Sequence, residues 1–277
     1  MLNRLRALAH HLNHAKMSAA STTIHNTNKA CCSIPPVKSD YVPKGTFKSI
    51  GNFKKVYVTG PETLGEAALV CVYDIFGFKP QTQQGADIIA ENLKIQVLMP
   101  DFFEDGHPWP VEHFPPKTDE DKKKLQEFFG SIASPPKNME KLLEFGHQLK
   151  DKGVRSIGTY GFCWGGKVII LAGAQQATPF SAVSLVHPAM LHAEDAQNLN
   201  VPIGLYPSND EPENEFHKMV EIMKKKPFAD KNDYKKYDSF HGFAAARANL
   251  DDPDNKEKYE ALYCDLIKFF SNNGVKA

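Results

Sequence analysis

The sequence predicts an α/β protein whose mostly parallel central sheet is covered by helices on both faces. After the first forty or so residues, short apolar, β-prone segments alternate with longer segments of helical pattern. No linker or internal repeat interrupts this alternation over the rest of the 277 residues. We therefore expect one folded domain, residues 41–277, preceded by an N-terminal extension, residues 1–40.

The expected elements follow from apolar patterning and from the turn residues between them. Strands are predicted where short apolar or alternating runs occur, at residues 69–72, 95–99, 156–160, 182–185, 201–206 and 233–237. Helices are predicted between or after them, at residues 83–93, 137–150, 166–174, 213–226 and 256–272. Strands that alternate with helices in this way favour parallel pairing.

The N-terminal extension has the composition of a targeting segment. Residues 1–39 contain lysine and arginine but no aspartate or glutamate, and leucines recur at near-helical spacing from Leu2 to Leu12. A basic amphipathic helix followed by serine and threonine is typical of a mitochondrial transit peptide. The alternatives are a disordered tail on a cytoplasmic protein and an extension upstream of a second start at Met17.

Charge and composition exclude several classes of partner. The 33 basic and 33 acidic side chains cancel, whereas a nucleic-acid-binding protein usually has a basic excess. No apolar run approaches the roughly 18 residues of a membrane helix. The five cysteines form no C-x-x-C pair, and no carboxylate–histidine cluster has metal-ligand spacing. We therefore expect a small-molecule partner, with no metal, cofactor, nucleic acid or membrane; the oligomeric state stays open.

The most informative pattern is Gly161-Phe162-Cys163-Trp164-Gly165. It lies between a predicted strand and a predicted helix and has the spacing of a nucleophile elbow, with cysteine in place of the usual serine. Such a turn strains the nucleophile's backbone and leaves no room for side chains two residues before and after it. The following helix N-terminus would favour a thiolate. The alternative interpretation is a structural cysteine beside a glycine-rich turn.

An elbow nucleophile needs an acid and then a histidine, in that order along the chain. Asp210 follows the predicted strand at 201–206, and His241 follows the predicted strand at 233–237. Each could be a surface loop residue when taken alone. The ordered set of Cys163, Asp210 and His241 nevertheless predicts a nucleophile, an acid and a base.

The chain resembles the dienelactone hydrolase family, and fungal members in particular, over roughly residues 40–275. The resemblance rests on the elbow, on Asp74-Ile75-Phe76-Gly77, on Pro100-Asp101-Phe102-Phe103, on Asp210 and on His241-Gly242-Phe243. It implies an α/β-hydrolase fold and a Cys-His-Asp triad. It also implies an oxyanion hole formed by the backbone amides of Ile75 and Trp164.

Two departures concern substrate binding. Bacterial members carry glutamate, which helps control the resting thiol, where this chain has Asp74. They also hold a substrate carboxylate with arginines, one of which lies four residues after the histidine. The nearest here is Arg247, six residues after His241, and Ala244-Ala245-Ala246 suggests a short helix that would bring Arg247 to the rim of the site.

The chemistry expected from these residues is hydrolysis of a lactone or carboxylic ester through a thioester at Cys163. Two other functions remain compatible with the sequence. Cys163 could serve as a redox or electrophile sensor, or the scaffold could bind a ligand or partner with little catalysis.

Overall fold

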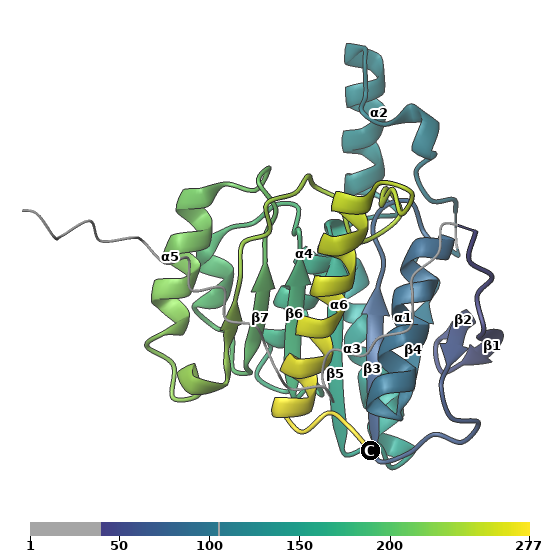
Figure 1. Ribbon diagram of the computed structural model, residues 1–277, viewed down its shortest axis with the longest axis vertical. Coiled ribbons are helices and arrows are strands. Elements are labelled where there is room, and N and C mark those ends of the chain that lie inside the picture. The colour runs from purple at the N-terminus through teal and green to yellow at the C-terminus, as the bar shows by residue number, and fades with distance from the viewer. Residues whose placement is uncertain (1–39, 105) are drawn as a thin grey trace, which may run out of the picture. The chain divides into compact units, whose positions relative to one another are not determined.

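The computed structural model describes residues 40–104 and 106–277, which lie around one eight-stranded sheet (Figure 1). The strand order is β1-β2-β4-β3-β5-β6-β7-β8. Pairing is antiparallel between β1 and β2 and between β2 and β4, and parallel elsewhere. The strands are β1 Thr46–Ile50, β2 Phe53–Thr59, β3 Ala67–Val72, β4 Gln96–Pro100, β5 Ser156–Phe162, β6 Ala182–Val186, β7 Ile203–Tyr206 and β8 Asp233–Tyr234.

Helices cover both faces of the sheet (Figure 1). On one face α1 packs against α6, and on the other α3 packs against α4. The α-helices are α1 Pro80–Leu93, α2 Asp119–Gly130, α3 Pro135–Asp151, α4 Trp164–Gly173, α5 Glu213–Met223 and α6 Pro253–Asn272. Short 3₁₀ helices lie at η1 Val111–His113, η2 Ala193–Ala196 and η3 Ala229–Lys231. The prediction of a mostly parallel sheet covered by helices on both faces is confirmed.

The central strands owe their place to their apolar character. Every residue of β3, β4, β6 and β7 is buried, as expected for parallel strands with helices above and below. The carboxyl ends of β3, β5, β7 and β8 lie at one edge of the sheet, and the segments that follow them carry the predicted site residues.

Three local expectations need revision. The structure has two strands, β1 and β2, where none was predicted, and a helix, α2, that was not named as an element. The strand expected at 233–237 is only two residues long. The expected targeting helix lies outside the described residues.

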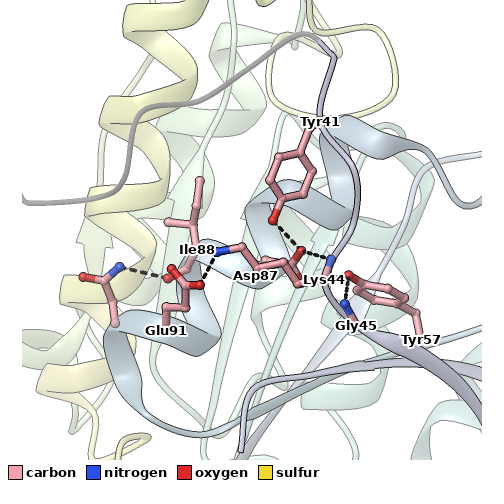
Figure 2. Close-up of polar contacts among 8 residues, drawn as sticks. Tyr41, Lys44, Gly45, Tyr57, Asp87, Ile88 and Glu91 are labelled. Carbon is pink, nitrogen blue, oxygen red and sulfur yellow. Dashed lines mark hydrogen bonds and ion pairs between the residues drawn. The ribbon is translucent and has the colours of Figure 1, made fainter.

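The segment before β1 is tied to α1 by one buried carboxylate, Asp87 (Figure 2). Its Oδ2 accepts hydrogen bonds from the Tyr41 hydroxyl at 2.7 Å and from the Lys44 amide at 2.9 Å. Its Oδ1 accepts a 2.8 Å bond from the Tyr57 hydroxyl, which in turn accepts from the Gly45 amide at 2.7 Å. Asp87 therefore joins the segment before β1, strand β2 and helix α1 in a single hydrogen-bond network.

Replacing Asp87 with alanine is expected to lower the free energy of unfolding by about 3 kcal/mol, because the Tyr57 hydroxyl and the Lys44 amide lose their acceptor. Urea unfolding followed by circular dichroism measures this change. Glu91→Ala is the matched control, since it removes only the exposed ion pair with Lys44 and should cost less than about 1 kcal/mol. Equal losses in the free energy of unfolding of the two variants would contradict the proposed contribution of Asp87 to stability.

Candidate active site

Cys163 occupies a sharp turn between β5 and α4. Its backbone has φ 52° and ψ −116°, outside the regions that side-chain-bearing residues prefer. A Cβ added at Gly161 would lie 2.5 Å from the carbonyl of Gly165, and one at Gly165 would lie 2.3 Å from the carbonyl oxygen of Val72. Both glycines are therefore required by close backbone approach, and the predicted elbow geometry is confirmed.

Hydrogen bonds with β6, with the loop after it and with α4 fix the backbone of Cys163. Its amide donates to the carbonyl of Val186 at 3.1 Å. Its own carbonyl accepts from the amides of Gly166 at 3.1 Å and Ala189 at 3.0 Å. The strained turn is thus fixed by hydrogen bonds on both of its sides, and the cysteine side chain remains partly exposed.

His241 lies against Cys163, as the sequence predicts. The two side chains line the same hollow, and the Nδ1 of His241 lies 2.6 Å from Oε1 of Glu211. Burial alone would lower the pKa of His241. The negative charge of Cys163 and its hydrogen bond, together with Glu211, outweigh burial and raise the pKa of His241 to about 10. At neutral pH the His241 ring is therefore protonated.

The structure assigns the carboxylate partner of His241 to Glu211 and not to Asp210. Asp210 is exposed, and its Oδ2 accepts a 2.6 Å hydrogen bond from the backbone amide of His241. Glu211 has a side chain only 3% exposed, and its second oxygen accepts from the amide of Ser208. The prediction for Asp210 as the ring partner is corrected. Two adjacent acids were visible in the sequence, but only the backbone of the turn decides which one faces inward.

Of the two backbone amides predicted to form an oxyanion hole, that of Trp164 directly follows Cys163, and that of Ile75 belongs to a loop that lines the same hollow. Trp164 is the first residue of α4, and its buried indole donates to the carbonyl of Ala133 at 2.7 Å. Ile75 follows β3, and its carbonyl accepts from Trp109 at 2.8 Å. Within the described part of the chain, neither the Trp164 nor the Ile75 amide donates to a protein acceptor. Their role toward an oxyanion stays a prediction.

Asp74, predicted to bind substrate or gate the thiol, is buried and joins two loops. Its Oδ1 accepts from the Phe76 amide at 3.0 Å and its Oδ2 from the Ala246 amide at 3.1 Å. Burial raises the pKa of Asp74, and these two amides oppose the rise, which ends at about 6. The carboxylate thus holds the Ile75 loop against the loop that follows His241.

Arg247 lies at the rim of the site, although not through the expected helix, since residues 241–247 form consecutive turns. Its Nη1 donates to the carbonyl of His241 at 2.9 Å. Its guanidinium lies 5.2 Å from the ring centre of Phe114 and 5.7 Å from that of Phe240. The side chain is exposed, so its charge faces solvent at the entrance.

These residues surround a hollow of about 20 Å³, which holds roughly one water. Among the described residues no group of three or more histidines, cysteines or acids could hold a metal ion, and no helix could cross a membrane. The lining residues are Asp74, Ile75, Phe76, Phe114, Cys163, His241, Gly242 and Arg247.

Comparison with known proteins points to one family. The sequence profile of the Dienelactone hydrolase family matches residues 55–273. An uncharacterised AIM2 family protein of Schizosaccharomyces pombe is 35% identical over 84% of this chain and 92% of its own. A carboxymethylenebutenolidase homolog of Xenopus tropicalis is 31% identical over 51% of this chain and 55% of its own.

Solved structures show the fold. A putative dienelactone hydrolase from Klebsiella pneumoniae superposes with a TM-score of 0.64 at 15% identity, over 83% of this chain and 98% of its own. Together with the family match, this similarity identifies the sheet and its helices as an α/β-hydrolase fold.

The assignment of Glu211 gives a direct prediction. Glu211→Gln should lower kcat roughly 100-fold or more, because it removes the charge that holds and stabilises the His241 imidazolium. The pKa of His241 should fall as well, so the alkaline inflection in the rate of Cys163 alkylation by iodoacetamide should move below pH 10. Steady-state ester hydrolysis and a pH series of alkylation measure the two effects.

Asp210→Asn is the matched control, because asparagine can still accept the hydrogen bond from the backbone amide of His241. Its kcat should stay within about threefold of wild type. A large loss in Asp210→Asn beside normal activity in Glu211→Gln would restore Asp210 as the acid.

Proposed function

Because the chain belongs to the dienelactone hydrolase family, and is therefore a hydrolase, we propose that it hydrolyses lactones or carboxylic esters with Cys163 as nucleophile, His241 as acid and base, and Glu211 as the carboxylate that orients His241. The observation that carries the proposal is that Cys163 and His241 line one hollow while the Nδ1 of His241 lies 2.6 Å from the buried Glu211 carboxylate.

Acylation begins from the thiolate–imidazolium pair. The Cys163 thiolate attacks the ester carbonyl carbon, and the carbonyl oxygen becomes an oxyanion that can accept from the free amides of Ile75 and Trp164. When the intermediate collapses, the bond from carbon to the alkoxy oxygen breaks. The leaving alkoxide takes the proton of the His241 imidazolium, so an alcohol and a thioester are formed.

Deacylation uses the same histidine in its neutral form. Thioester formation removes the negative sulfur that raised the pKa of His241, so this pKa falls in the acyl-enzyme. Neutral His241 then accepts a proton from water while the oxygen attacks the thioester carbonyl. Cys163 leaves as a thiolate, the carboxylic acid is released, and the thiolate–imidazolium pair is regenerated.

The nucleophile also limits the substrate class. A thiolate is a better leaving group than an amine anion, so the tetrahedral adduct of an amide would expel sulfur and return to substrate. Esters, lactones and thioesters carry leaving groups that compete with sulfur. We therefore expect these substrates and not peptides.

Cys163→Ala should lower the hydrolysis of activated esters by at least about 10³-fold, because no other group can form the acyl-enzyme. Cys163→Ser should also be poor, since a neutral hydroxyl needs more help from the base than a thiol. Hydrolysis of a panel of aryl esters and lactones by purified enzyme measures both, with circular dichroism to verify the fold. Near-normal activity in Cys163→Ala would refute the mechanism and leave a sensing or binding role for the scaffold.

Arg247→Ala should raise KM for a carboxylate-bearing lactone and leave KM for a neutral aryl ester unchanged. The reason is that Arg247 lines the entrance as an exposed cation, and its hydrogen bond goes to the backbone carbonyl of His241 and not to the ring. Paired Michaelis–Menten curves for the two substrates test this expectation. Equal effects on both, or no effect on either, would show that Arg247 is structural and that neutral esters are the better substrates.

A further inference from the structure

His187 is a second histidine at the carboxyl edge of the sheet, and the mechanism above does not use it. It directly follows β6, is fully buried, and has a positive φ of 34°. Its amide donates to the carbonyl of Tyr206 at 2.8 Å. Two residues later, the Ala189 amide holds the carbonyl of Cys163. The turn that begins at His187 therefore belongs to the support of the nucleophile elbow.

The imidazole of His187 fills the space beside the proposed base. Its ring centre lies 5.0 Å from that of His241, with the planes 63° apart. On its other sides it contacts Phe162 and Phe243, each with ring centres 5.6 Å away. His187 thus lies between the end of β5 and the loop that carries His241, and it limits rotation of the His241 ring away from Glu211.

The nitrogens of His187 play no part in this contact. Neither Nδ1 nor Nε2 has a hydrogen-bond partner among the described residues. Burial lowers the pKa of His187 well below its usual value, and the nearby charges of His241 and Arg247 lower it further. The ring is therefore neutral, and what it offers to the charged His241 is an aromatic surface.

We propose that His187 is a positioning residue whose neutral aromatic ring holds the His241 imidazolium in line with Cys163 and Glu211. This inference rests on the proposed function, because it assigns His187 a role through His241. A neutral ring packed against the His241 ring opposes its displacement without adding a competing charge.

The test separates the ring from its nitrogens. His187→Phe keeps an aromatic ring of similar size, whereas His187→Ala and His187→Leu remove it. We expect kcat to stay within about threefold in the phenylalanine variant and to fall roughly 10- to 100-fold in the other two, with KM changed less than about threefold. His217→Ala, an exposed histidine on α5 that pairs with Glu213, is the matched control and should behave as wild type.

A second readout follows the His241 imidazolium itself. In His187→Ala and His187→Leu, the alkaline inflection in the pH dependence of Cys163 alkylation by iodoacetamide should move to lower pH, because a displaced His241 ring loses part of its interaction with Cys163 and Glu211, the two groups that raise its pKa. In His187→Phe it should stay near that of wild type. A merely structural role would change the stability of the fold, followed by urea unfolding, and leave this inflection in place.

Three outcomes would overturn the inference. If His187→Phe loses as much activity as His187→Leu, a nitrogen and not the ring is required. If His187→Leu keeps wild-type kcat, or keeps the wild-type inflection despite a lower kcat, His187 does not position His241. Should His187→Ala fail to fold, the leucine variant decides, since it fills the space. Full activity in Cys163→Ala would refute the proposed function itself, whereas an inactive Cys163→Ala beside an unaffected His187→Leu refutes only the positioning role.

Discussion

The site depends on one steric constraint, the close approach of backbone to backbone where β5 turns into α4. The main chains of β3, β5 and α4 leave no room for a Cβ at Gly161 or Gly165, so the chain can pass only with Cys163 at a positive φ. This turn brings the sulfur to the N-terminus of α4, where the Trp164 amide is free. The backbone of the sheet and of the turn therefore sets the position of the thiol, and no contact by the Cys163 side chain itself is required.

His241 is governed by a balance between burial and neighbouring anions. Burial disfavours its charge, while the sulfur and Glu211 favour it, and the anions prevail in the free enzyme. In the proposed mechanism only Glu211 would remain once the sulfur is acylated. The one histidine would then be an acid toward the leaving alcohol and a base toward water, because the reaction itself would remove one of the two charges that hold its proton. Glu211, buried and hydrogen-bonded through both of its oxygens, would keep the ring oriented through both stages.

Local pattern was enough to predict the central strands and the strained turn at Cys163, because buried parallel strands and such turns have distinctive sequences; the pairing of Cys163 with His241 stays a prediction. Local pattern failed where tertiary contacts decide. β1 is almost wholly exposed, and only Phe47 and Ile50 among its five residues are apolar. Residues 243–246 do not form the expected helix because their backbone groups bind distant partners: Asn255 at Phe243, Tyr263 at Ala244 and Asp74 at Ala246. The choice of Glu211 over Asp210 likewise rests on the path of the turn, which adjacent acids cannot reveal.

Those same tertiary contacts divide the site into a fixed part and an adjustable part. The loop after His241 is tied down at three backbone groups, and Asp74 joins it to the Ile75 loop, so the reacting groups cannot shift without breaking buried hydrogen bonds. The entrance is held more weakly, since Arg247 rests on the rings of Phe114 and Phe240 and has one hydrogen bond to the His241 carbonyl. Exposed contacts of this kind contribute little. Under the proposed function, a substrate would pass these weakly held side chains to reach the sulfur, so the entrance and not the fixed part of the site would select among esters.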